Sequence, residues 1–187
     1  MKRYDELADW WVLMSPPEDY AAEAGPVARL LDPGDAPGRP RLLELGAGGG
    51  HLAALRTARA HLREGGVALF CPDRTVECFA PGATMGGTDG MDRGMRYLEW
   101  VHPCGDGSTY DSDLVYILRD PGGERTVVHD RITLGAFARA TWIRLLDKAG
   151  FGQVAIEQQS GRDVFRARVA GSTTAGRCVG PSRGSPT

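Results

Sequence analysis

The sequence predicts an α/β fold, because a short apolar strand, a glycine cluster, a helix and a second apolar strand follow one another. The first strand is predicted over 41–45, the glycine turn over 46–50, the helix over 51–63 and the second strand over 67–70. Strand, helix and strand in this order make one βαβ unit. Further along, alternating apolar and polar residues between turn signals predict antiparallel strands. A chain of 187 residues is long enough to bury a core as one domain.

Two helices are predicted before this unit. Apolar residues recur at helical spacing over 4–14, and the two prolines that follow end that helix. A second helix is predicted over 18–31, where Pro26 kinks or splits it. Residues 32–40 are rich in proline and glycine and are predicted to form a loop.

The second half alternates in strand fashion. Residues 75–93 are glycine-rich and are predicted to be irregular. Antiparallel strands are then predicted over three segments: 96–102, 113–119 and 124–131. An apolar stripe predicts a helix over 138–149, and two final strands form a hairpin: 154–158 and 164–169. Residues 171–187 have low complexity and are predicted to form a disordered tail.

Composition and charge exclude several classes of function. A net charge of −2 and a pI near 6.1 give no electrostatic case for binding nucleic acid or an anionic membrane. The N-terminus is charged, and no apolar run approaches the ~20 residues of a membrane span. We therefore expect a cytoplasmic protein. The four cysteines form no CxxC pair and have no histidine at zinc-ligand spacing, so we expect free thiols and no metal.

The glycine cluster is the most informative motif. Glu44, Gly46, Gly48 and Gly50 form the pattern ExGxGxG directly after the first predicted strand. A glycine turn between a strand and a helix N-terminus lets a ligand approach the backbone closely. A dinucleotide site is one alternative, but it needs a small residue at the position of His51. The pattern resembles motif I of class I S-adenosylmethionine-dependent methyltransferases.

This resemblance implies a cofactor site. In the family, the turn backbone contacts the methionine part of S-adenosylmethionine, and the acidic residue lies beneath its amino group. The N-terminal helices are similar to the family's lid helices, which close over the cofactor. The cofactor-binding residues that the resemblance implies are Glu44, Gly46, Ala47, Gly48 and Gly50. Tyr20 is a further candidate, which would close over the cofactor, and core packing of its helix is the alternative.

The resemblance extends over residues 1–170. The segment 58–66 is similar to the helix and turn before the family's fifth strand, and the LLDKAGF segment at 145–151 is similar to the entry to its C-terminal hairpin. The segment 128–131 is similar to amino-sugar N-methyltransferases. The resemblance implies one methyltransferase-like domain over 1–170, with lid helices over 1–36 and an antiparallel insertion over 94–132.

The resemblance also implies that the cofactor domain is internally shortened. The family sheet has the strand order 3-2-1-4-5-7-6, and only strands 1, 5, 7 and 6 can be assigned in this sequence. Because a βαβ repeat takes about 30 residues, roughly 60–70 residues are absent. The acidic residue that ends the family's second strand and holds the ribose has no counterpart, and Asp73 is the nearest replacement. We therefore expect a truncated Rossmann-like sheet.

His129 is the candidate catalytic residue, because an imidazole can act as general base toward an amine or hydroxyl. A surface role is the alternative, and Asp130 does not orient it, since neighbours on a strand point to opposite faces. The expected function is methyl transfer from S-adenosylmethionine to a small-molecule acceptor. A catalytically inactive remnant is the alternative, and a homodimer is left open.

Overall fold

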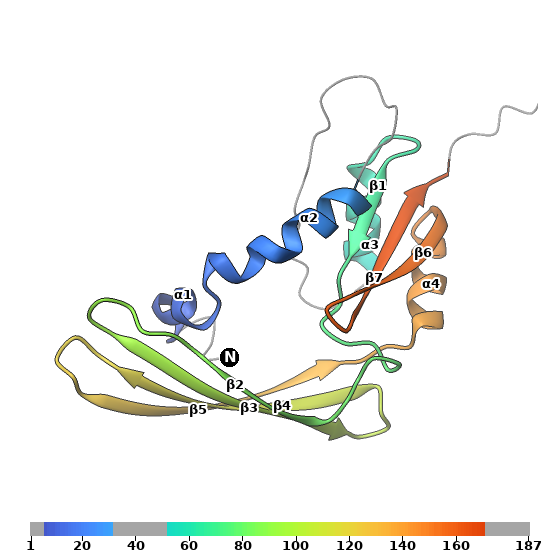
Figure 1. Ribbon diagram of the computed structural model, residues 1–187. Coiled ribbons are helices and arrows are strands. Elements are labelled where there is room, and N and C mark those ends of the chain that lie inside the picture. The colour runs from blue at the N-terminus through green and yellow to red at the C-terminus, as the bar shows by residue number, and fades with distance from the viewer. Residues whose placement is uncertain (1–5, 32–51, 171–187) are drawn as a thin grey trace, which may run out of the picture.

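The strands form two separate sheets. The computed structural model describes residues 6–31 and 52–170, so the predicted first strand, the glycine turn and the tail at 171–187 lie outside the described residues. One sheet has three strands in the order β1-β7-β6, and the other has four in the order β2-β3-β4-β5. Figure 1 shows the helices α1 and α2 and the three-stranded sheet on the same side of the four-stranded sheet. The prediction of a mixed α/β fold with antiparallel strands is confirmed.

The N-terminal segment is helical, in four short pieces: η2 (Ala8–Trp10), α1 (Trp11–Met14), η3 (Pro17–Tyr20) and α2 (Ala21–Leu30). Pro16 is extended and stands between α1 and η3, as its fixed backbone requires. Pro26 lies inside α2 and does not split it. None of the described helices is long and apolar enough to cross a membrane.

The three-stranded sheet packs against two helices. Its strands are β1 (Val67–Phe70), β6 (Phe151–Gln159) and β7 (Arg162–Val169), and its helices are α3 (Leu52–Ala60) and α4 (Arg139–Lys148). Leu55 of α3 and Leu146 of α4 pack with Phe165 of the central strand β7. Trp142 stacks on Phe165 with ring centroids 5.3 Å apart. The two helices and the sheet therefore share one core.

β6 and β7 form the predicted C-terminal hairpin. Its turn holds Ser160 and Gly161 at φ values of 48° and 76°, the left-handed region that two-residue hairpin turns require. β7 pairs on its other side with β1, antiparallel from Val67–Arg168 to Phe70–Phe165. The N-terminal strand β1 is therefore joined to the C-terminal hairpin.

The four-stranded sheet has one strand more than the sequence predicts, and its other three strands are longer than predicted. Its strands are β2 (Gly82–Gly86), β3 (Gly94–Cys104), β4 (Thr109–Arg119) and β5 (Arg125–Gly135). The prediction that residues 75–93 are irregular was wrong for β2. Two of the five residues of β2 are glycines, and four of the five are exposed, so its propensity and burial pattern are weak. Its pairing with β3 makes it a strand.

The two faces of this sheet differ. We call inner the face on which Leu114 and Tyr116 of β4 lie, because they pack with Leu7 and Leu13 of the N-terminal segment. The opposite, outer face carries Val115 and the other alternate residues of β4. Because side chains alternate along each strand, the register assigns every residue of the sheet to one face.

Candidate functional site

The predicted glycine motif cannot be placed. Its cofactor-binding residues, Glu44, Gly46, Ala47, Gly48 and Gly50, lie outside the described residues. The elements on either side of the predicted unit are described. The helix α3 begins at Leu52, directly after the motif, and β1 follows it. The order helix then strand is that of the predicted βαβ unit.

The carboxyl end of β1 is open. Cys71 and Asp73 follow Phe70, the last residue of the strand, and both are exposed. Among the described strands, β1 pairs with β7 alone, so one of its edges has no described neighbour. Open α/β sheets bind ligands at the carboxyl ends of their strands. This end of β1 is therefore accessible to a ligand.

Tyr20 ends the short helix η3. Its side chain is 50% exposed, and its hydroxyl is hydrogen bonded to the hydroxyl of Ser15. This contact stays within the N-terminal segment. The role of Tyr20 as a cofactor-closing residue stays a prediction.

His129 lies on the outer face of the four-stranded sheet. Its register partner is Val115, and its side chain is 63% exposed. Its Nε2 atom lies 3.7 Å from Oδ1 of Asp113, and the Nε2 atom of His102 lies 2.9 Å from Oδ2 of the same carboxylate. Asp130 is buried on the opposite face, in agreement with strand alternation. The structure thus does not bring His129 together with the carboxyl end of β1.

The inner face carries a different polar group. Glu99 of β3 accepts a hydrogen bond from the Ser112 hydroxyl at 2.6 Å and one from the Thr84 hydroxyl at 3.3 Å. Each donor reaches a different carboxylate oxygen, so the orientation of Glu99 is fixed from two neighbouring strands. Glu99 is half-buried, whereas Ser112 is fully buried. An oriented, partly desolvated carboxylate can bind a cationic group more strongly than a free surface carboxylate can.

Tyr110 links this face to the end of β1. It is 3% exposed, and its ring lies 5.2 Å from that of Phe79. Burial, and next the charge of Asp73, raise the pKa of Tyr110 to about 12, with Glu99 adding to the effect and Arg74 opposing it. The contact with Phe79 joins the inner face to the segment that follows β1.

A buried carboxylate fixes this loop. Asp163, at the start of β7, accepts a hydrogen bond from Thr75 at 2.5 Å and two from Arg139 at 2.8 Å each. Gln158 also donates to it. The side chain of Asp163 has no exposed area. Asp163 thereby joins the loop after β1, the start of α4 and the β6–β7 hairpin.

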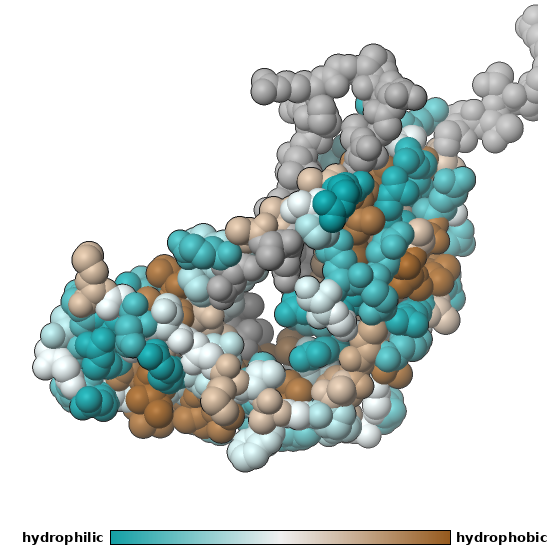
Figure 2. Space-filling view, viewed as in Figure 1, coloured by the Kyte–Doolittle hydropathy of each residue, from teal (hydrophilic) through white to brown (hydrophobic). Residues whose placement is uncertain are grey.

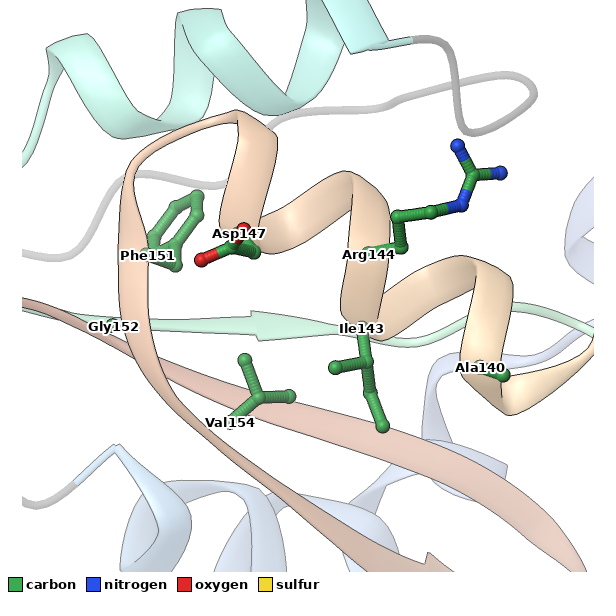
Figure 3. A pocket seen from close by; sticks show the side chains of 7 residues that line it. All are labelled: Ala140, Ile143, Arg144, Asp147, Phe151, Gly152 and Val154. Carbon is green, nitrogen blue, oxygen red and sulfur yellow. The ribbon is translucent and has the colours of Figure 1, made fainter.

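A groove and a search for metal ligands add no further candidate site among the described residues. A groove of about 600 Å³ lies between α4 and β6, and Figure 3 shows its lining of mostly apolar side chains with Arg144 and Asp147. No residue predicted from the sequence as a site residue lines it. Within 6–31 and 52–170, no group of three or more histidine, cysteine or acidic side chains could hold a metal ion.

Comparison with known proteins identifies the fold. No protein-family model matches the sequence, and no curated protein is significantly similar to it. Solved structures do match. DesVI of Streptomyces venezuelae is 22% identical with a TM-score of 0.55, and the match covers 64% of this chain and 50% of DesVI. The chain has a methyltransferase-like fold.

Two further structures with this fold are similar. The sugar N-methyltransferase KedS8 from a Streptoalloteichus species is 20% identical with a TM-score of 0.54, over 70% of this chain and 60% of KedS8. CalS10, an amino pentose methyltransferase from Micromonospora echinaspora solved with bound S-adenosylmethionine, is 20% identical with a TM-score of 0.52, over 70% of this chain and 62% of CalS10. The match thus spans about half to three fifths of the length of each of these three proteins.

Sequence reasoning missed two residues of the inner face, Glu99 and Tyr110, and Asp163 of β7. None was predicted as a site residue, because each lies in a strand whose partner could not be named from the sequence. One signal was available. Acidic or hydroxyl residues at alternating positions of an otherwise apolar strand indicate polar groups that need partners across the sheet.

Proposed function

We propose that the chain binds S-adenosylmethionine and transfers its methyl group to an amine or hydroxyl of a small molecule, such as an amino sugar. One observation carries the proposal. The methyltransferase-like fold occurs in the same chain as an ExGxGxG motif placed directly before a helix, α3, and a strand, β1. Both the fold and the motif are compatible with S-adenosylmethionine as the ligand.

The strand assignment supports a shortened sheet. In the proposal β1, β7 and β6 are the family's strands 5, 7 and 6, whose order matches the observed sheet. Residues 41–45, predicted as strand 1, lie outside the described residues, and one edge of β1 has no described neighbour. The short matched length of DesVI and the other relatives supports the loss of the strands between them.

The cofactor is assigned to the motif and the end of β1. The turn at 46–50 would hold its methionine part, with the carboxylate of Glu44 near its positive charges and Tyr20 closing the site. S-adenosylmethionine, when bound, supplies an electrophilic methyl group on a sulfonium. The residues present are compatible with this ligand, since α3 begins directly after the turn and the carboxyl end of β1 is exposed. Asp73 is proposed to replace the missing ribose-binding acid.

The acceptor is assigned to the inner face. A protonated amine would bind the oriented carboxylate of Glu99, which two hydroxyl groups hold in place. In-line methyl transfer requires mainly proximity and orientation, together with removal of one proton from an ammonium. Glu99 is placed to accept that proton. His129 as general base is the alternative, and it requires the acceptor to lie on the outer face.

A catalytically inactive remnant is the second candidate. The observation that favours it is the matched length, only 50–62% of the three similar methyltransferases. Fold and activity are separate properties, because function depends on the site. Cofactor affinity distinguishes the two candidates.

The deciding experiment is calorimetric titration of the folded, full-length chain with S-adenosylmethionine and S-adenosylhomocysteine. We expect micromolar binding, and we expect Gly48→Val to abolish it, because a branched side chain fills the turn. Gly82→Val is the matched control, since a Cβ there meets no atom within 4 Å and the residue lies in a strand. If the folded protein binds neither compound up to millimolar concentration, the enzyme proposal is wrong and a remnant scaffold remains.

A further inference from the structure

The outer face of the four-stranded sheet carries an exposed apolar band. Four of its side chains are exposed to 47–81%: Met85, Val127, Trp100 and Ile117. Leu98 and Val115 lie between them and are partly buried. Figure 2 shows hydrophobic residues gathered along the lower side of this sheet, away from α1 and α2. A contiguous exposed apolar surface of this kind marks an interaction site.

The register shows that the band is continuous. Met85 of β2 stands opposite Leu98 of β3, and Leu98 stands opposite Val115 of β4. Ile117, two residues along β4, stands opposite Val127 of β5. Each of the four strands therefore contributes to one band that crosses the sheet.

The two ends of the outer face carry opposite charge. At one end Asp89 is ion-paired to two arginines, Arg96 and Arg119, and a third arginine, Arg125, stands opposite Arg119. At the other end two carboxylates, Asp111 and Asp113, share one arginine, Arg131. The outer face is thus basic, then apolar, then acidic along the strands.

We propose that the outer face binds the outer face of a second copy of this chain. Strands β3, β4 and β5 are each 11 residues long and β2 has five. With about 4.8 Å between strands and about 3.4 Å per residue, the face covers about 600 Å², so two copies would bury about 1,200 Å². That area reaches the lower bound of a specific protein interface.

The charges select one orientation of the two copies. With the two-fold axis between the sheets and perpendicular to the strands, β4 of one copy runs antiparallel to β4 of the other. The basic end of each outer face then lies over the acidic end of its partner, and apolar bands meet at the centre. An axis parallel to the strands would place like charges together. Two sheets that pack face to face lie about 10 Å apart.

This interface leaves the proposed acceptor site open. Glu99 and Tyr110 lie on the inner face, so a dimer through the outer face covers neither. His102 and His129 would be covered, because both lie on the outer face. The dimer therefore does not depend on methyl transfer, and either proposal can fail without the other.

Sedimentation velocity of the full chain over a range of concentrations tests the proposal. We expect a dimer that dissociates on dilution and on addition of salt, and we expect the double variant Met85→Glu/Val127→Glu to be monomeric. Both side chains are exposed, so the substitutions leave the monomer's core intact. Burial of two unpaired carboxylates would raise the dissociation constant at least ~100-fold. Ile143→Glu on α4 is the matched control, because Ile143 is 42% exposed and lies outside the face.

A second variant tests the orientation. Arg125→Glu reverses one charge at the basic end without touching the apolar band, and it should weaken the dimer about tenfold while abolishing much of its salt dependence. A wild-type chain that stays monomeric at high concentration would overturn the proposal. So would a dimer that survives the double variant, or a monomer that binds vesicles of anionic phospholipid through this face.

Discussion

Arg139 holds Asp163 through two parallel hydrogen bonds, from Nε to Oδ2 and from Nη2 to Oδ1, each 2.8 Å long. Arg139 is the first residue of α4 and Asp163 the second of β7, so the pair joins two elements that are 24 residues apart. Thr75 joins the loop after β1 to the same carboxylate. Asp163 therefore helps to hold that loop, together with the backbone bridge between Thr75 and Phe137.

Replacement of this acid should strongly destabilise the fold. In Asp163→Ala, Arg139 loses its ion pair and Thr75 loses its acceptor, so we expect the free energy of unfolding to fall by about 3 kcal/mol. Urea unfolding followed by circular dichroism measures the change. Asp92→Ala is the matched control, because Asp92 is exposed in a bend. Equal stability of the two variants would show that the hydrogen bonds at Asp163 contribute nothing net.

The same carboxylate should make stability depend on acid pH. The hydrogen bonds from Arg139 hold the pKa of Asp163 below its usual value, against the opposing effect of burial. Because the folded-state pKa is lowered, the carboxylate stabilises the fold above the unfolded-state pKa of about 3.9, and this contribution is lost as pH falls through the lower folded-state pKa. The stability difference between wild type and Asp163→Asn should therefore shrink from pH 5 downward, as acid titration of unfolding measures.

Asp111 and Asp113 have lowered pKa values too, through hydrogen bonds from Thr133 and from His102 respectively. Both carboxylates are present in wild type and in Asp163→Asn, so their effects cancel in the difference. A difference that stays constant down to pH 3 would contradict the assignment of this acid dependence to Asp163.

Tyr110 should make stability depend on alkaline pH. Burial and the charge of Asp73 raise its pKa to about 12, above the unfolded-state value of about 10. The stability that the neutral phenol contributes is therefore complete below pH 10 and is lost as pH rises from 10 toward 12. Wild type should lose more stability over this range than Tyr110→Phe, measured by urea unfolding. Parallel losses in both proteins would show that this phenol is not buried.

Much of the three-stranded sheet could be predicted from sequence. The strand at 67–70, the helix of which Leu146 is part and the hairpin at Ser160 and Gly161 all have clear periodicity or turn chemistry. β2 could not be predicted, because Gly82 and Gly86 give it no strand propensity and it exists through pairing with β3.

The candidate site was harder to predict than the fold. A histidine next to acidic residues draws attention to His129, whereas the register places it on the outer face. Glu99 carries no motif. Its significance comes from Ser112 and Thr84, which lie 13 residues after it and 15 before it and meet it only across strands. Contacts between strands depend on register, and register is fixed by the whole sheet rather than by local sequence.

Asp73 is predicted to contribute to cofactor binding. A carboxylate that accepts hydrogen bonds from the ribose hydroxyls is worth about 1.5–3 kcal/mol, so Asp73→Asn should weaken S-adenosylmethionine binding about tenfold or more. Titration calorimetry measures the affinity, with Asp92→Asn as the matched control. Unchanged affinity in Asp73→Asn would show that no acid has replaced the one missing from strand 2.

Substitutions of Glu99 and of His129 would show on which face of the sheet the acceptor binds. Assays of methyl transfer to a panel of amino sugars would compare Glu99→Gln with His129→Gln, which remove the candidate base from the inner and the outer face respectively. We expect Glu99→Gln to raise the acceptor KM about tenfold, to lower kcat and to leave cofactor affinity unchanged, because it removes both a charge-assisted contact to the amine and the group that accepts its proton. His129→Gln should change neither KM nor kcat. If His129→Gln instead lowers kcat and removes its pH dependence near the ordinary imidazole pKa, the acceptor lies on the outer face and His129 is the base.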